Sequence, residues 1–294
     1  MTHGAATHAS AVIFGLSPLW VATTLFVVTY LVIMSDKLNR AIVALLGAGL
    51  VILLGVGSQH EAMAAVDFNT LGLLLGMMLI VNITRRSGLF QYVAIWSAKK
   101  VDARPWGILL MMSIVTAVFS AFLDNVTTVL LTVPVTLLIT DELKVKPYPY
   151  LFAQIFASNI GGTATLIGDP PNILIGSAIG LTFNEFLVNL APVVVLNLLI
   201  LVAMYWLAGR KSAKLETSGL AALADLDAKR IVSNYPLLYK SLAVTAVTIV
   251  GFLLHGALHL EPATIALGGA TLLVLVGRVT AVRALEEVEW ATLF

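Results

Sequence analysis

The chain lacks cysteine altogether, and charged side chains make up only 11% of its 294 residues. Without cysteine, disulfides and thiolate metal sites are excluded. The formal net charge of +1 provides no basic surface for phosphates, so no nucleic-acid partner is expected. Hydrophobic residues reach 59%, a composition typical of an all-α polytopic membrane protein whose main partner is the lipid bilayer.

Motifs of common enzyme classes are missing as well. The sequence contains no HExxH pair, no GxSxG elbow and no Walker lysine. We therefore expect no enzyme, no ATP-driven pump, and no cofactor other than sodium or a proton as a coupling ion.

Apolar segments of nearly membrane-spanning length alternate with short polar connections. The segments cover residues 19–34, 41–57, 68–84, 106–140, 149–181, 186–209, 241–258 and 263–277. The longest connection, residues 210–240, carries clustered charge and is expected to be a cytoplasmic loop. It separates a first half, residues 1–209, from residues 241–294, which we interpret as the incomplete start of a second half.

Basic residues mark one side of the membrane, because Lys and Arg accumulate in short cytoplasmic loops. With the N-terminus outside, all 17 Lys and Arg fall in inner connections, including residues 85–105. The opposite connections offer only histidines and acids as titratable residues. This distribution predicts an integral protein of a bacterial inner membrane.

Residues 106–140 form a helical hairpin in this topology, with Asp124 and Asn125 at its tip. The second arm, residues 126–140, would rise about 22 Å, less than the ~30 Å apolar core of a bilayer. This length favours a re-entrant hairpin over two full spans, although both return the chain to the same side.

The next apolar segment, residues 149–181, is interrupted by residues that a continuous membrane helix disfavours. Pro170 and Pro171 remove backbone donors, and Asp169 would place a carboxylate at membrane depth. We therefore expect a discontinuous helix with its hinge or break at Gly168, Pro170 and Pro171. Secondary transporters build ion and substrate sites from the loose amides and carbonyls of such breaks.

An internal repeat relates residues 41–72 to residues 263–294. With a shift of 222 positions, 12 of the 32 aligned pairs are identical. The connection after the first copy has no Lys or Arg, whereas its counterpart contains Arg278 and Arg283. Opposite orientations are therefore expected, as in inverted-repeat transporters. A second hairpin and a second broken helix would then follow Phe294, and the chain is interpreted as a fragment or a truncated paralogue.

Two acids fall inside apolar segments, Asp124 at the hairpin tip and Asp169 at the helix break, and intramembrane charge is a functional signal by default. Carboxylate, amide and hydroxyl oxygens suit a small hard cation such as sodium. The amides that begin the following helices would instead favour an anion. The polar residues around the two acids are Asn125, Thr127, Thr128, Ser158, Asn159, Thr163, Thr165 and Asn172.

Each of these features also has a plainer explanation. Asp124 or Asn125 would cap the second hairpin arm, and Asp169 followed by proline is an ordinary helix start. The two roles are compatible, because a cap at membrane depth also lines the cavity. Gly161 and Gly162 are expected to serve close packing, as small residues at helix crossings usually do, and Gly168 is expected to be the hinge.

Three further polar residues are expected to be structural. Asn82 is interpreted as part of a solvated helix end. His255 and His259 are expected in an exposed outer turn, with pH sensing as the alternative.

The motifs SAFLDNVTTVLLTVPV, residues 120–135, and SNIGGTATLIGDPPNILIG, residues 158–176, closely resemble the arsenite permease and NhaD-type sodium/proton antiporter family of the ion-transporter superfamily. The two motifs are also similar to those of the P protein, which belongs to that family. The resemblance covers essentially the whole chain. It implies an elevator-type exchanger in which the hairpin tip and the broken helix form a first cation site.

Transferred by position, the resemblance gives that site to Asp124, Asn125, Val126, Gly162, Thr163, Gly168 and Asn172, with sodium at Asp124, Asn125, Thr163 and Asn172. Related dicarboxylate carriers are similar here but have a serine in place of Asp124. The added carboxylate suits cation or proton coupling and counts against a doubly negative substrate beside it. For this reason a sodium-coupled di- or tricarboxylate (citrate-like) carrier ranks below the leading interpretation and is kept as a further alternative.

The sequence thus predicts an ion-coupled secondary transporter, either a sodium/proton antiporter or a permease for arsenite or another small inorganic or organic anion. The alternative is a non-transporting or partner-dependent half-transporter, because the chain stops soon after Thr292. A homodimer would supply two copies of the first half, but it requires dual insertion, which the one-sided positive charge opposes.

Overall fold

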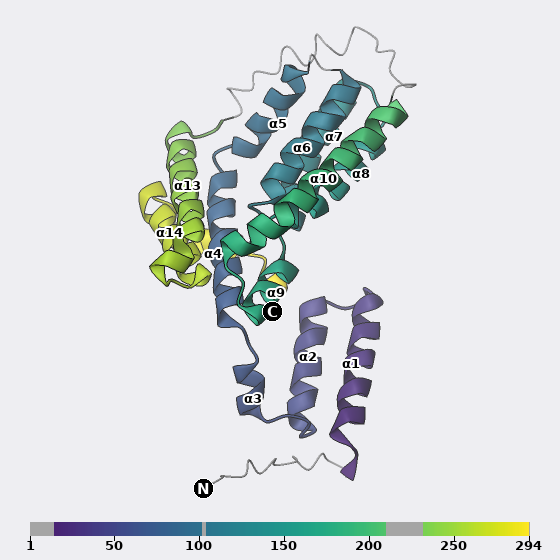
Figure 1. The fold of residues 1–294 in the computed structure, drawn as a ribbon, viewed down its shortest axis with the longest axis vertical. Helices are drawn as coiled ribbons and strands as arrows, with labels where there is room; N and C mark the ends of the chain where they lie inside the picture. Colours follow the sequence, from purple (N-terminus) through teal and green to yellow (C-terminus); the bar gives the residue numbers. More distant parts are fainter. Residues whose placement is uncertain (1–14, 102–103, 210–231, 294) are drawn as a thin grey trace. The chain divides into compact units, whose positions relative to one another are not determined.

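The computed structural model describes residues 15–101, 104–209 and 232–293, and every regular element within these ranges that spans four or more residues is an α-helix (Figure 1). The predicted all-α fold class is confirmed. Most of the predicted loop 210–240 lies outside the described residues.

The helices are α1 Pro18–Met34, α2 Arg40–Leu53, α3 Gln59–Ala64, α4 Phe68–Arg85, α5 Leu89–Lys100, α6 Pro105–Ser120, α7 Asn125–Glu142, α8 Tyr148–Gly162, α9 Pro170–Ile179, α10 Phe183–Gly209, α13 Tyr235–Leu258, α14 Pro262–Gly277, α15 Ala281–Glu286 and α16 Trp290–Leu293.

The chain divides by packing into two compact units. The first consists of residues 1–68 with 289–294, and the second of residues 69–288. In the first unit α1 packs on α2, and α16 contacts α2. The second unit contains the hairpin, the broken helix and all candidate site residues.

Three of the described helices, α4, α10 and α13, are long and apolar enough to cross a membrane. Only 17% of the most apolar stretch of α10 is buried, and the helix exposes Val188, Leu199 and Met204. Apolar side chains on such a helix suit lipid rather than water, as the composition predicts.

Helices α6 and α7 form the predicted hairpin. The second arm is longer than expected, because α7 continues through the polar residues Asp141 and Glu142. Its 18 residues rise about 27 Å, close to the thickness of the apolar core. Length therefore no longer separates a re-entrant hairpin from two full spans.

Helix α5 lies where the sequence suggested only a basic connection, residues 85–105. Its residues Phe90, Ala94 and Ala98 are buried and recur every four positions, so one face of the helix packs on α6 and α7. The basic residues Lys99 and Lys100 occupy only the last turn. They made the whole connection resemble a loop.

The helix boundaries follow the internal repeat. Helices α2, α3 and α4 begin at residues 40, 59 and 68, and helices α14, α15 and α16 begin 222 residues later, at 262, 281 and 290. The two repeated stretches therefore share their secondary structure. Their opposite orientation stays a prediction.

Candidate functional site

The hairpin tip is built around a helix cap. Helix α6 ends at Ser120, and Asp124 begins α7 by accepting the N–H of Thr127 on Oδ1 at 2.9 Å. The capping interpretation of Asp124 is confirmed. Because the cap uses one carboxylate oxygen, a ligand would bind through the other.

The broken helix is unwound over residues 163–169, between the end of α8 at Gly162 and the start of α9 at Pro170. Pro170 and Pro171 occupy the first turn, where a missing N–H costs no helical hydrogen bond. Asp169 stands at the N-cap position, but its side chain makes no capping hydrogen bond. The predicted helix start is confirmed, whereas a capping role for the Asp169 side chain is not.

Asn172 fixes the shape of the break. Its side-chain nitrogen donates to the carbonyl oxygens of Gly162 at 2.9 Å and Thr165 at 3.0 Å. These two carbonyls would otherwise be among the loose acceptors of the unwound stretch. The amide group of Asn172 thus acts within the break itself, and only its own carbonyl oxygen is left for a ligand.

Glycines allow the hairpin and the broken helix to approach backbone to backbone. A Cβ added to Gly161 would lie 2.1 Å from the Ala117 carbonyl oxygen, and one added to Gly168 would lie 2.7 Å from that of Ser120. The Ser120 hydroxyl also donates to the Ser158 carbonyl oxygen at 2.7 Å. Gly161 serves close packing as expected, and Gly168 is packed as well, whereas its hinge role stays a prediction.

The polar centre of the site is Asn125. Its side-chain nitrogen donates to Asn159 Oδ1 and to Asp169 Oδ2, both at 3.2 Å. One amide thus joins the hairpin tip to both arms of the broken helix. Asp124 directly precedes Asn125 as the cap of α7, so two acids and two amides are gathered at the hairpin tip and the break. Their oxygens are groups that suit a small cation.

Three other predicted site residues make no side-chain hydrogen bond to Asp124, Asn125 or Asp169 within the described part of the chain. Val126 leaves 56% of its side chain exposed. The hydroxyls of Ser158 and Thr163 donate within their own helix, to Ile155 at 2.9 Å and to the carbonyl oxygen of Asn159 at 2.9 Å. Their lone pairs are the groups that a cation would use.

The candidate site at the hairpin tip and the break offers a metal ion hard oxygen ligands. Within the described residues, no group of three or more His, Cys, Asp or Glu side chains comes together. Such a composition does not suit a transition metal but is compatible with sodium, which binds carboxylate, amide and carbonyl oxygens.

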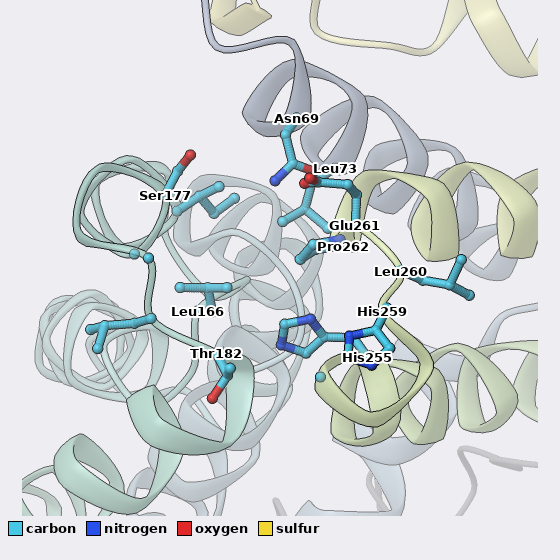
Figure 2. A pocket seen from close by; sticks show the side chains of 15 residues that line it. Asn69, Leu73, Leu166, Ser177, Thr182, His255, His259, Leu260, Glu261 and Pro262 are labelled. Atoms are coloured by element: carbon cyan, nitrogen blue, oxygen red, sulfur yellow. The ribbon is translucent and has the colours of Figure 1, made fainter.

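A narrow crevice beside Asp124 adjoins a larger cavity. The crevice is lined by Asp124 together with Leu74, Met77, Met78, Val81, Ile167 and Ile173. The cavity, of about 480 Å³, shares Ile173 and continues along α4 through Leu73 and Asn69. Figure 2 shows Leu166, Ser177 and Thr182 on one side of this cavity and His255, His259 and Glu261 across from them. The cavity therefore leads toward the hairpin tip, with apolar side chains between.

His255 is not the exposed turn residue that the sequence suggested. It is half-buried, and its Nε2 accepts the N–H of Phe183 at 3.0 Å, which ties the end of α13 to the start of α10. Phe183 in turn stacks on Phe252 with ring centroids 5.8 Å apart. His259, by contrast, is exposed as expected.

Two polar residues of the second unit were missed or misread from the sequence. Asn82, expected at a solvated helix end, is 7% exposed and donates to the Glu287 carbonyl oxygen at 2.7 Å. Ser120 was not considered, although it bonds the tip to the broken helix. Its place as the first residue of the hairpin motif was the one available signal.

The chain is similar to several known proteins. The family described as citrate transporter matches residues 30–294. An uncharacterized transporter of Mycobacterium tuberculosis is 43% identical over 278 residues, covering 93% of this chain and 64% of that protein. The 46 kDa membrane protein of Mycobacterium leprae is 39% identical over 277 residues, covering 93% of this chain and 65% of that protein. The human P protein is 37% identical over 217 residues, which is 69% of this chain and 26% of that protein.

Proposed function

We propose that this chain, which belongs to the citrate transporter family, carries the coupling-cation site of an ion-coupled secondary transporter. That it is part of a membrane transporter follows from the family and from the relatives named as transporters. The chain spans 64% of the length of the mycobacterial relative, so the activity of the whole protein is also a proposal. The kinship to mycobacterial proteins supports a bacterial inner membrane as its location.

The observation that carries the proposal is the double hydrogen bond of Asn125 to Asn159 and Asp169. It brings one carboxylate of the break to the hairpin tip, where Asp124 supplies a second. Two negative charges at membrane depth are costly unless something neutralises them. A bound cation would do so, and its binding would favour the closed arrangement of tip and break.

Sodium is the cation that the ligands favour. Asp124 and Asp169 would supply carboxylate oxygens, and Asn125, Thr163 and Asn172 would supply neutral ones, as sodium requires. A proton would compete for the same two carboxylates. The site therefore suits coupling to sodium, with protons as the competing or exchanged ion.

A citrate-like carboxylate is the cargo that the family description supports. Asp124 and Asp169 would repel such an anion while both are charged, so we expect the cation to bind first and the anion second. Sodium/proton antiport is the second candidate. It is favoured by the same pair of acids, because sodium and protons would occupy them in turn.

The flux of the whole native protein in liposomes tests the proposal. Radiolabelled citrate uptake and internal pH would be followed under a sodium gradient, a pH gradient or neither. We expect the sodium gradient to accelerate citrate uptake about tenfold and Asp169→Asn to remove the acceleration. Asp141→Asn is the matched control, since its carboxylate is 82% exposed and pairs with Lys144.

The outcomes separate the two candidates. Sodium-driven proton movement without citrate uptake would favour antiport. Fluxes that respond to neither gradient, or that respond equally in Asp169→Asn, would overturn the coupling role of the site.

A further inference from the structure

Behind the hairpin tip, the interior of the α5–α8 bundle contains buried polar side chains that the proposed cation site does not use. In the described part of the chain, five of their oxygens have no hydrogen-bond partner: Gln91 Oε1 and Ser97 Oγ on α5, and Thr116 Oγ1, Thr128 Oγ1 and Gln154 Oε1 on the other three helices. Thr116, Thr128 and Gln154 are 0% exposed. An unpaired buried polar group costs about 1–3 kcal/mol, and native proteins contain few of them.

These last three residues come from three helices that are locked together. Thr116 on α6 and Gln154 on α8 lie one turn before Ser120 and Ser158, which bond to each other, so they share a depth and a face. Gln154 also donates from Nε2 to Thr136 Oγ1 of α7 at 2.7 Å. The unpartnered oxygens of α6 and α8 therefore lie next to the polar face of α7.

That polar face of α7 runs from Thr128 through Thr132 to Thr136, over about 12 Å. Thr128 begins it directly behind the tip, because its N–H donates to the carbonyl oxygen of Asp124 at 3.0 Å. The hydroxyls of Thr132 and Thr136 donate to carbonyls one turn back, both at 3.0 Å, which is ordinary in membrane helices. Such local bonding explains these two hydroxyls but not the unpartnered oxygens.

Toward the basic end the bundle becomes apolar. Met112, Ile139 and Tyr150 belong to one buried hydrophobic cluster shared by α5, α6, α7 and α8. The threonine series continues one turn further, to Thr140, which is 2% exposed and neighbours Ile139 of this cluster, so the polar face ends in a buried interior.

We propose that Thr116, Thr128 and Gln154 bind a row of internal water molecules, called here the water file, enclosed between the hairpin tip and this apolar cluster. A buried water needs two to four polar partners and both donates and accepts. The hydroxyls of Thr116 and Thr128 can do both, while Gln154 Oε1 only accepts. Because the site holds neutral oxygens and no carboxylate, water suits it better than a bare cation.

This inference deepens the proposed function, on which only its role depends. Water one turn behind Asp124 would supply or take up ligands as the coupling cation exchanges its hydration shell for protein oxygens. Occupancy of the file by water does not itself require transport.

Isosteric substitution gives a test whose outcome differs in sign. Thr116→Val and Thr128→Val in the whole native protein remove a hydroxyl at nearly constant volume. If water binds there, each variant loses hydrogen bonds and its melting temperature falls by ~2–4 °C. A rise or no change would overturn the proposal, because removing an unpartnered hydroxyl from a dry interior relieves its desolvation cost.

The matched control is Thr248→Val on α13, whose hydroxyl is 3% exposed and donates to the Val244 carbonyl oxygen at 2.9 Å. Its melting temperature should change less than that of Thr116→Val and Thr128→Val. Melting temperatures measured in sodium chloride and in choline chloride at the same concentration distinguish bound water from a bound sodium ion. A deficit of the two variants that appears only in sodium would overturn water in favour of a cation.

A measurement on the unsubstituted protein covers the case in which a variant fails to fold. Solid-state NMR with magnetisation transferred from water to ¹³C-labelled threonines should reach Thr116 and Thr128 faster than Thr248. Equal or slower transfer would contradict the water file. Neither experiment measures flux, so failure of this inference and failure of the proposed function are distinguishable.

Discussion

The side-chain nitrogen of Asn125 donates to Oδ2 of Asp169 at 3.2 Å, across a sequence separation of 44 residues. This contact attaches the unwound stretch of the broken helix to the hairpin tip. It also explains why Asp169 does not cap its own helix, since its carboxylate points to the neighbouring element. A cation bound to Asp169 would therefore influence the contact between the two elements.

Asn125→Leu removes this contact while keeping the size of the side chain. We expect the sodium concentration for half-maximal transport to rise about tenfold, because a ligand oxygen and the positioning of Asp169 are both lost. The measurement is the sodium dependence of flux in liposomes. Asn189→Leu is the control, since that amide donates to the Glu185 carbonyl oxygen of its own helix at 2.7 Å. An unchanged sodium dependence in Asn125→Leu would contradict the role of Asn125.

Two substitutions of Asp124 separate its cap from its charge. Asparagine caps helices as well as aspartate does, so Asp124→Asn should keep the melting temperature but lose cation-coupled flux. Asp124→Ala should lose coupling and also about 1 kcal/mol of stability, because the N–H of Thr127 loses its acceptor. Thermal unfolding and flux of the two variants check this. Coupled flux in Asp124→Asn would show that only the cap matters.

Gly161→Ala tests the backbone contact between hairpin and broken helix. The added methyl would lie 2.1 Å from the Ala117 carbonyl oxygen, so the helices must separate, and overpacking of this kind costs about 1–3 kcal/mol. Gly268→Ala on α14 is the control, since its Cβ would meet no atom within 4 Å. We expect the control to be neutral or slightly stabilised in thermal unfolding. Equal stability of the two variants would contradict the close approach.

Glu61 gives a pH-dependent prediction outside the membrane segments. The N–H and hydroxyl of Ser58 donate to Glu61 Oε2 at 2.8 and 2.9 Å and hold the pKa of Glu61 below its ordinary value of 4.5. The capping box therefore stabilises α3 above the ordinary pKa and is lost as the pH falls through the lowered one. Ser58→Ala should raise the pKa of Glu61, measured by NMR titration in micelles. An unchanged titration would show that the box does not form in solution.

The hairpin and the helix break were predictable from the sequence because their signals are local. Asp124 followed by a helical run and Asp169 followed by two prolines mark helix starts wherever they occur. Helix α5 was not predicted, since Lys99 and Lys100 masked an amphipathic pattern in the residues before them. The interpretation of this segment as a loop followed its charged residues, whereas the spacing of its apolar residues indicates a helix.

The contacts that assemble the site were beyond sequence reasoning. Both acids were equally good caps by pattern, and only tertiary packing turned Asp169 toward Asn125. In the same way, nothing local distinguishes Asn172 as a residue that holds two carbonyls of the break, or Asn82 as a buried donor. Such assignments need the relative placement of helices.

Equilibrium binding of radioactive sodium to the purified native protein tests the central claim most directly. The account predicts saturable binding that falls about tenfold or more in Asp124→Asn and in Asp169→Asn but is unchanged in Asp141→Asn. Binding that is absent from the native protein, or equal in all four proteins, would contradict a sodium site at the hairpin tip and the helix break.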